Sequence, residues 1–193
     1  MPKRRVKQVS WEVESERLVV KPAMERRIRK AVLQRAEKEL SELADASTDE
    51  EAFYALPNAA SAAYYSGLFE EAERLARRSI TLAEQFKDNW NYSNALHAGH
   101  TVLGLLALRS KSTQQAVEAL HASGSVRGSP QLGSFGPTMQ LARELLKAGE
   151  SESVLAYFEQ CRSFWKSGSL WLSIWEKKVK RGAMPNFVMN LYR

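Results

Sequence analysis

The fold of this chain is decided by residues 103–120, which read LGLLALRSKSTQQAVEAL. Apolar and small residues recur there every three or four positions, on both sides of a short polar stretch at 110–112. That spacing is typical of two amphipathic helices joined by a tight turn. Gly104 in the first helix and Ala116 in the second are small enough to let a neighbouring helix approach closely. The stretch therefore predicts an antiparallel pair of closely packed helices.

The same spacing of small and turn residues, here called the repeat frame, occurs twice more in the chain. Ala60 and Ala142 stand where Gly104 stands, at intervals of 44 and 38 residues. Gly67 and Gly149 follow them where a first helix must end, and glycine adopts the left-handed turn of a helix C-terminus without strain. Both intervals exceed the period of about 34 residues that helix–turn–helix repeats show. We therefore expect an insertion between each pair and the next.

Other positions of the frame predict the contacts of the second helices. Ala72 and Val154 stand where Ala116 stands, and they allow a close approach in the same way. The larger side chains that follow are predicted to fill the space between one pair and the next: Leu75, Leu120 and Phe158.

Most of the remaining chain also favours helices. Apolar residues between 24 and 43 keep helical spacing, which predicts a helix of about twenty residues after Pro22. Thr48 followed by Glu51 is a capping-box pattern and predicts the start of the next helix. Residues 123–137 are expected to form one long loop, and Pro137 suits the first turn of the helix that follows. Residues 9–20 alternate as a short strand or extended segment does.

These features resemble the tetratricopeptide repeat (TPR) family over residues 50–166, and specifically its uncharacterised bacterial proteins. Residues 103–107 are the closest match, and Lys111 departs from the pattern because a turn glycine is usual there. The resemblance implies an all-α fold, with antiparallel helical pairs stacked as a short TPR-like α-solenoid. Another kind of helical bundle remains the alternative.

The expected organisation has two parts. A basic arm or extended segment occupies 1–21, and a single helical-repeat domain occupies 22–193, with repeats at about 50–86, 94–123 and 137–166 and a capping helix at about 169–181. The capping helix carries tryptophans on one face and basic residues at its end. Such a helix would cover the last apolar face of the stack.

Composition excludes several classes of protein. Of the 193 residues 44% are hydrophobic, which is enough for a core. The single cysteine, Cys161, excludes an internal disulfide and with it a disulfide-stapled secreted scaffold. No apolar run approaches the ~18 residues that a membrane span needs, and no signal-peptide core follows the basic N-terminus. We therefore expect a cytoplasmic protein without a membrane partner.

Charge is distributed unevenly along the chain. Residues 1–30 and 162–193 each carry a net charge of +6, whereas residues 31–161 carry −6. The basic ends either fold back on the acidic body, stay solvated, or attract a polyanion such as nucleic acid or an acidic protein.

No constellation of residues indicates catalysis. His97 and His100 are three apart on one predicted helix and so share a face, but a metal site needs a third or fourth ligand. Cys161 lies in no recognisable nucleophile motif, which favours a small buried residue. The glycine-rich stretch 128–137 lacks the spacing of a phosphate-binding loop. We expect a protein that is not an enzyme and that uses no metal and no cofactor.

The family resemblance also implies where a partner would bind. Tetratricopeptide arrays bind partner segments in a groove lined by the first helix of each pair. In this frame the groove-facing residues are Tyr54, Ser61, Tyr64, Tyr65, Leu105, Leu108, Arg109, Arg143, Leu146 and Lys147. The groove would be aromatic at one end and basic at the other, which suits an extended acidic peptide.

The expected function is therefore that of a protein-binding module, a scaffold or adaptor that holds a protein or peptide partner. The alternative is a nucleic-acid-associated protein that uses the basic N- and C-terminal segments.

Overall fold

The computed structural model describes residues 22–187 and 190–191, and this part of the chain is helical, without a strand. Its elements are α2 (Pro22–Ala44), α3 (Asp49–Tyr65), α4 (Phe69–Ala83), η1 (Glu84–Phe86), α5 (Tyr92–Arg109), α6 (Thr113–Gly124), α7 (Pro130–Phe135), α8 (Gln140–Lys147), α9 (Ser151–Phe164), η2 (Lys166–Gly168) and α10 (Ser169–Lys180).

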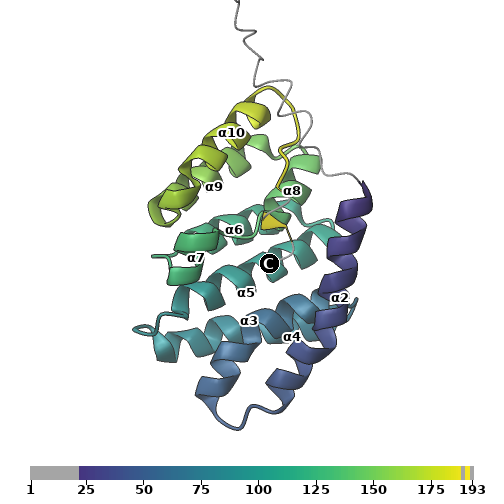
Figure 1. Cartoon of the computed structure of the whole chain (residues 1–193), viewed down its shortest axis with the longest axis vertical. Helices are drawn as coiled ribbons and strands as arrows, with labels where there is room; N and C mark the ends of the chain where they lie inside the picture. Colours follow the sequence, from purple (N-terminus) through teal and green to yellow (C-terminus); the bar gives the residue numbers. More distant parts are fainter. Residues whose placement is uncertain (1–21, 188–189, 192–193) are drawn as a thin grey trace, which may run out of the picture.

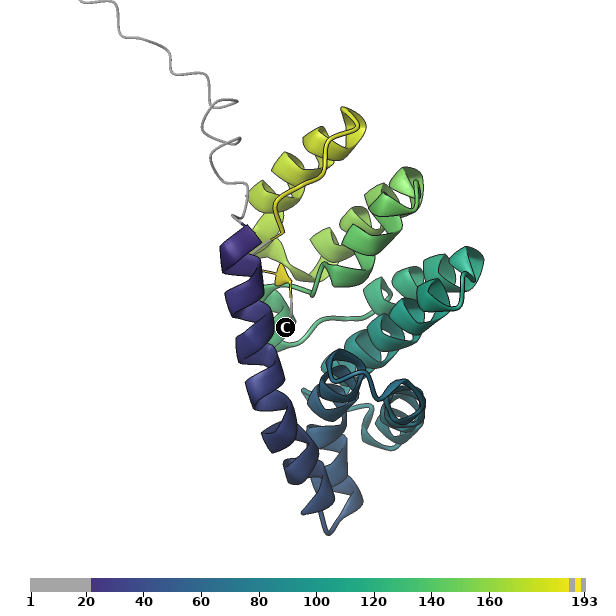
Figure 2. The ribbon, with the colours of Figure 1, turned by 90° about the vertical axis from the view of Figure 1, so that its right-hand side faces the viewer.

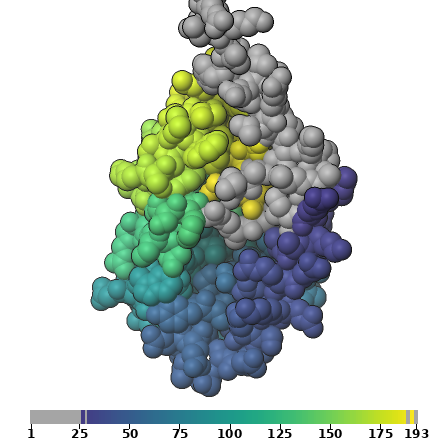
Figure 3. Space-filling view, in the orientation of Figure 1, coloured from purple at the N-terminus to yellow at the C-terminus, as the bar shows by residue number. Residues whose placement is uncertain are grey.

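The helices form antiparallel pairs that stack in chain order, α3 with α4, α5 with α6 and α8 with α9 (Figure 1). The long helix α2 packs on α3, and Figure 2 shows it running along one side of the stack while the pairs fan away from it. α10 packs on α9 at the end of the molecule opposite the first pair (Figure 3). This is the expected α-solenoid of helical pairs with a capping helix. The expected arm at 1–21 lies outside the described residues.

The capping and turn residues that the sequence predicts are found at the ends of the helices. The Thr48 Oγ1 accepts a hydrogen bond from the Glu51 amide at 3.1 Å, and the Glu51 carboxylate accepts one from the Thr48 amide at 3.1 Å, so the capping box of α3 is confirmed. Gly67 and Gly149 have φ values of +81° and +94° at the ends of α3 and α8. Lys111 holds the equivalent turn after α5 with a φ of 60°, a conformation that strains any residue with a Cβ atom.

The small residues of the repeat frame lie at close helix contacts, as predicted. Ala60, Gly104 and Ala142 are all buried. A Cβ atom on Gly104 would lie 2.3 Å from Leu141 Cδ2 and 3.1 Å from the Ala119 Cβ, so Gly104 brings α5 against both α6 and α8. The larger residues predicted to fill the space between pairs are buried as well: Leu75, Leu120 and Phe158.

The core consists of two apolar clusters along the stack. One lies within α3, α4 and α5 around Phe53 and Leu75, and the other lies between α5 and the C-terminal helices around Phe158 and Trp175. Tyr64 and Leu96 pack against both clusters. The two pairs at the ends of the stack are therefore joined through the middle pair.

The C-terminal segment closes the second cluster. On α10, Leu172 and Trp175 are buried, whereas Trp171 remains 45% exposed. Phe187 then packs edge-on against Trp175, with ring centroids 4.9 Å apart. The amide nitrogen of the Asn190 side chain donates to the carbonyl oxygens of Phe135 and Pro137, at 3.1 and 2.9 Å, so the segment also holds the connection between α7 and α8.

The prediction of one long loop at 123–137 was wrong, because this stretch contains the short helix α7. Ser129 caps α7 by accepting a hydrogen bond from the Leu132 amide at 3.0 Å, and Pro130 occupies its first turn.

The prediction that Pro137 begins a helix was also wrong. The amide of Thr138 donates to His97 Nε2 at 3.1 Å, and the amide of Met139 donates to the Asn190 carbonyl at 2.7 Å. These tertiary hydrogen bonds hold the chain after Pro137 in a non-helical conformation, so α8 begins only at Gln140.

We predict that Gly104→Ala lowers the free energy of unfolding, measured by chemical denaturation, by about 1–3 kcal/mol relative to Gly133→Ala. Both glycines lie in helices, where alanine is favoured by about 1 kcal/mol. A Cβ atom on Gly133 would meet only the Phe164 carbonyl oxygen at 3.5 Å, an ordinary contact. The difference between the two variants therefore isolates the contact at Gly104. Equal stability of the two would show that α5 and α8 are not in close contact there.

Candidate binding groove

A groove in two adjoining parts runs along α3 and α5. The first part, here called the aromatic cavity, has a volume of about 380 Å³, and the second, the basic cleft, has a volume of about 870 Å³. Tyr64, Tyr65 and Leu105 line both parts. Because the two parts share these residues, we treat them as one continuous groove.

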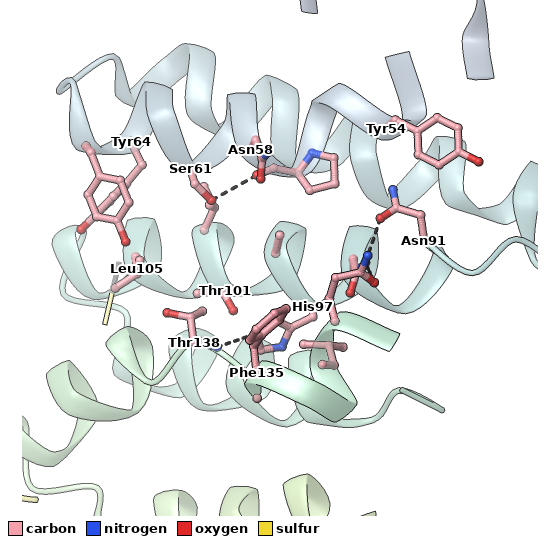
Figure 4. A pocket seen from close by; sticks show the side chains of 18 of the residues that line it. Tyr54, Asn58, Ser61, Tyr64, Asn91, His97, Thr101, Leu105, Phe135 and Thr138 are labelled. Carbon is pink, nitrogen blue, oxygen red and sulfur yellow. Dashed lines mark hydrogen bonds between the residues drawn. The ribbon is translucent and has the colours of Figure 1, made fainter. Parts of the chain in front are cut away.

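The aromatic cavity lies between α3 on one side and α5 with α7 on the other. In Figure 4, Asn58 and Ser61 extend from α3 toward His97, Thr101 and Phe135 on the facing wall, and Tyr54 lies at one end of the cavity. Its lining contains no Asp, Glu, Lys or Arg. The ligand that fits such a wall is an uncharged group with apolar surface and a few polar atoms.

Three exposed aromatic side chains surround this cavity. Tyr54, Trp90 and Phe135 keep 38%, 49% and 59% of their surface in solvent. The rings of Tyr54 and Trp90 stack with centroids 5.6 Å apart, and the side-chain Nδ2 of Asn89 donates to the Tyr54 hydroxyl at 2.7 Å. Large exposed apolar side chains that gather at one hollow typically mark a binding surface.

Polar atoms without a partner also lie in the cavity wall. Within the described part of the chain, two buried hydroxyl oxygens make no hydrogen bond, those of Ser93 and Thr101, and only Thr101 lines the cavity. The side-chain amide of Asn58, which is exposed on α3, has no hydrogen-bond partner among the described residues either. A buried hydroxyl without a partner is costly, so a ligand that satisfies it gains affinity.

His97 forms part of the cavity wall in its neutral form. Its Nδ1 donates to the Ser123 carbonyl at 3.0 Å, and its Nε2 accepts from the Thr138 amide at 3.1 Å, which places the single ring proton on Nδ1. Burial lowers the pKa of His97 to about 4, outweighing the hydrogen bond to Ser123, and nearby His100 lowers it further. His97 therefore joins α5 to the end of α6 and to the segment before α8.

The basic cleft carries an excess of positive charge. Its charged lining residues are Arg29, Arg109, Arg143, Glu144 and Lys147. Glu144 pairs with both Arg143 and Lys147, at 3.1 and 2.9 Å, so a single carboxylate is shared between two cations.

Arg109 is held in the cleft by an aromatic ring rather than by a carboxylate. Its guanidinium carbon lies 3.7 Å from the centroid of the Phe69 ring, and no acidic side chain of the described residues pairs with it. A cation–π contact orients the guanidinium without removing its charge. Arg109 is therefore available to a carboxylate from outside.

Two tyrosines stand where the cavity meets the cleft. The Tyr65 hydroxyl donates to the Gln140 side chain, so it joins α3 directly to α8. Tyr64 packs edge-on against Tyr65 and Phe69, and burial, with Glu144 nearby, raises the pKa of its phenol. The phenol of Tyr64 is therefore neutral near pH 7, and the two tyrosines form the floor between the two parts.

The structure brings together nine of the ten residues that the sequence placed in a groove. Tyr54 and Ser61 line the aromatic cavity, Tyr64, Tyr65 and Leu105 line both parts, and Leu108, Arg109, Arg143 and Lys147 line the basic cleft. Leu146 lines neither and packs against the second core cluster. That these residues bind a partner remains a prediction.

Sequence reasoning missed one wall of the cavity. This wall is one face of α5. Residues at helical spacing before the predicted Leu105 share its face, and this spacing is the signal that could have found Thr101, Ala98 and Asn94. The prediction of a loop at 123–137 leaves Phe135 out, although Ser129 before Pro130 is the signal of a helix start.

The residues considered for other chemistry form no common site. His97 lines the aromatic cavity, whereas His100 lines a separate hollow between α4, α5 and α6. No group of three or more His, Cys, Asp or Glu that could hold a metal ion occurs among the described residues.

Cys161 is buried, which raises the pKa of its thiol and keeps it protonated. No helix in the described part of the chain is long and apolar enough to cross a bilayer.

No protein-family model, curated protein or solved structure matches this chain. The class of protein is therefore defined by the fold and the groove: an α-solenoid of antiparallel helical pairs whose first helices line an aromatic cavity and a basic cleft.

We predict that acid destabilises the protein through His97. The pKa of His97 is about 4 in the folded chain and 6.5 in the unfolded chain, so the unfolded chain takes up the proton first as the pH falls. The stability contributed by the neutral ring is complete above pH 6.5 and is lost toward pH 4, by on the order of 3 kcal/mol.

Chemical denaturation at a series of pH values checks this. His97→Gln should be less stable at pH 7 but should lose less stability between pH 7 and 4 than the wild type. His121→Gln, which changes a half-buried histidine, should keep the wild-type dependence. Identical pH dependence of His97→Gln and the wild type would contradict the role of His97.

We also predict that dialysis against a chelator leaves the melting temperature unchanged. His97 and His100 line different hollows, and both ring nitrogens of His97 are used within the fold. Stoichiometric zinc in the purified protein, together with a lower melting temperature after chelation, would overturn this expectation.

Proposed function

We propose that this chain is a protein-binding module that holds an acidic segment of a partner protein in the groove along α3, α5 and α8. The observation that carries the proposal is the charge of the basic cleft, where four cations surround one carboxylate, Glu144. In this proposal the chain is a TPR-like adaptor in the cytoplasm, and it carries out no catalytic step.

The geometry of the cations supports a carboxylate ligand. Arg109 and Lys147 come from different helical pairs, α5 and α8, and both line the same cleft. Guanidinium groups bind carboxylates with two parallel hydrogen bonds, and ammonium groups add a point charge. A segment with two or more acidic residues would therefore bridge α5 and α8.

The shape of the cleft supports an extended segment of chain. The aromatic cavity continues from the cleft through Tyr64 and Tyr65, so the groove is longer than either part. An extended peptide exposes side chains along its whole length and leaves its backbone free for polar groups such as the Asn58 amide.

The alternative, a nucleic-acid-associated protein, would use the basic ends instead. On α10, Lys180 already pairs with Glu176 at 2.7 Å, and Lys177 and Arg181 also have partners. The described C-terminal charges are therefore partly compensated within the fold, which favours the groove.

We predict that Arg109→Glu with Lys147→Glu lowers the affinity for a fluorescein-labelled peptide of four consecutive glutamates by roughly 10- to 100-fold. This loss of affinity corresponds to about 1.5–3 kcal/mol, the usual contribution of a hydrogen bond to a charged group. Fluorescence anisotropy measures the binding, and circular dichroism checks the fold. Arg143 is left unchanged because its side chain is mostly buried.

The matched control is Arg74→Glu with Arg77→Glu, which changes the same charge on the exposed side of α4, outside both parts of the groove. This control should bind the peptide as the wild type does. Tight binding of a labelled oligonucleotide at physiological salt, lost on removing residues 1–8 and unaffected by the groove variants, would contradict the proposal.

A further inference from the structure

The aromatic cavity is unsuited to the carboxylates that the basic cleft attracts. Its walls are uncharged, and its histidine is neutral. Charged groups lose hydration on entering such a site without gaining an opposite charge. The cavity therefore calls for a different part of the ligand.

The rim of the cavity selects for a flat apolar group. Tyr54, Trp90 and Phe135 are all exposed there, whereas the other large exposed apolar residues of the described chain line neither part of the groove. Aromatic pairs add about 0.5–1.5 kcal/mol beyond the area that they bury. The volume of about 380 Å³ is at the low end for ligand sites, which suits one ring-bearing side chain.

The wall selects for a ring with a polar atom. Thr101 is only 6% exposed, its hydroxyl has no hydrogen-bond partner among the described residues, and it lies on α5 between His97 and Leu105 (Figure 4). A tryptophan N–H or a tyrosine O–H entering between α3 and α5 would donate to this oxygen. Phenylalanine would fill the same space and leave the hydroxyl without a partner.

The two parts of the groove have a defined order along the helices. On α3 the cavity residues centre near Asn58 and the cleft begins at Tyr64, and on α5 the same order runs from Thr101 to Arg109. At 1.5 Å per helical residue, the two parts are roughly 10 Å apart. An extended chain covers this distance in about three residues.

We propose that the groove binds a partner segment in which a tryptophan or tyrosine stands about three residues away from a cluster of carboxylates. The ring enters the aromatic cavity and donates to Thr101, and the carboxylates lie in the basic cleft. This inference rests on the proposed function, because it assigns the same groove a two-part ligand.

The test uses the full chain and a labelled peptide, GGWSGEEEGG, with both ends blocked. Replacing its Trp by Ala, or moving the Trp next to the Glu cluster, should lower the affinity roughly twofold to tenfold. On the protein, Phe135→Ala should lower the affinity for the Trp peptide to a similar extent. Leu170→Ala is the matched control, since Leu170 is 70% exposed on α10 and outside the groove.

A second comparison isolates the hydroxyl of Thr101. Thr101→Val should weaken binding of the Trp peptide about fivefold and leave binding of the corresponding Phe peptide unchanged. The variant removes a buried hydroxyl without a partner, so its stability should equal or exceed that of the wild type. Loss of binding by misfolding is thereby separated from loss of a contact.

The outcomes distinguish the two proposals. If no acidic peptide binds, the proposed function fails. If acidic peptides bind and depend on Arg109, but the Trp, its position and Phe135→Ala make no difference, only the present inference fails.

The chain's own residues 11–16 read WEVESE, an aromatic residue followed by carboxylates. Tighter binding of the probe to a Trp11→Ala chain would overturn the assignment of the cavity to a separate partner.

Discussion

The neutral imidazole of His97 donates to the carbonyl of Ser123 at the end of α6 and accepts from the amide of Thr138 before α8. The chain leaves the helical stack between these two points to form α7. One buried side chain thus satisfies backbone groups on both sides of that excursion, where no regular helix can do so. The third pair is thereby held at a fixed position relative to the second, and the wall of the aromatic cavity is completed.

Close packing at small residues and hydrogen bonds between helical pairs have different roles in this solenoid. Gly104 and the alanines of the frame allow the pairs to stack, and that stacking buries the two apolar clusters. The hydrogen bonds of Asn190 and the contact between Tyr65 and Gln140 then fix which surfaces face the groove. The apolar contacts account for most of the stability, whereas the polar ones specify a single arrangement.

In the proposed complex, the groove would combine two kinds of recognition on adjacent surfaces. Carboxylates approach the cations of the basic cleft from a distance, and their attraction depends on salt. Binding of a ring in the aromatic cavity would depend instead on shape and on a hydrogen bond to the unpartnered hydroxyl of Thr101, which act only at contact. A ligand that must satisfy both is discriminated from the many proteins that are merely acidic.

The sequence by itself determined the helices that form the pairs, their pairing and nine of the residues that line the groove. Helical spacing, the capping box at Thr48 and the turn glycines are local signals, and local chemistry is the same in any fold that keeps the helix. Only the tertiary structure decided the start of α8 and the position of α7 over the cavity. Each of these depends on a partner more than twenty residues away in the chain, as Thr138 depends on His97, and spacing along one helix carries no information about such a partner.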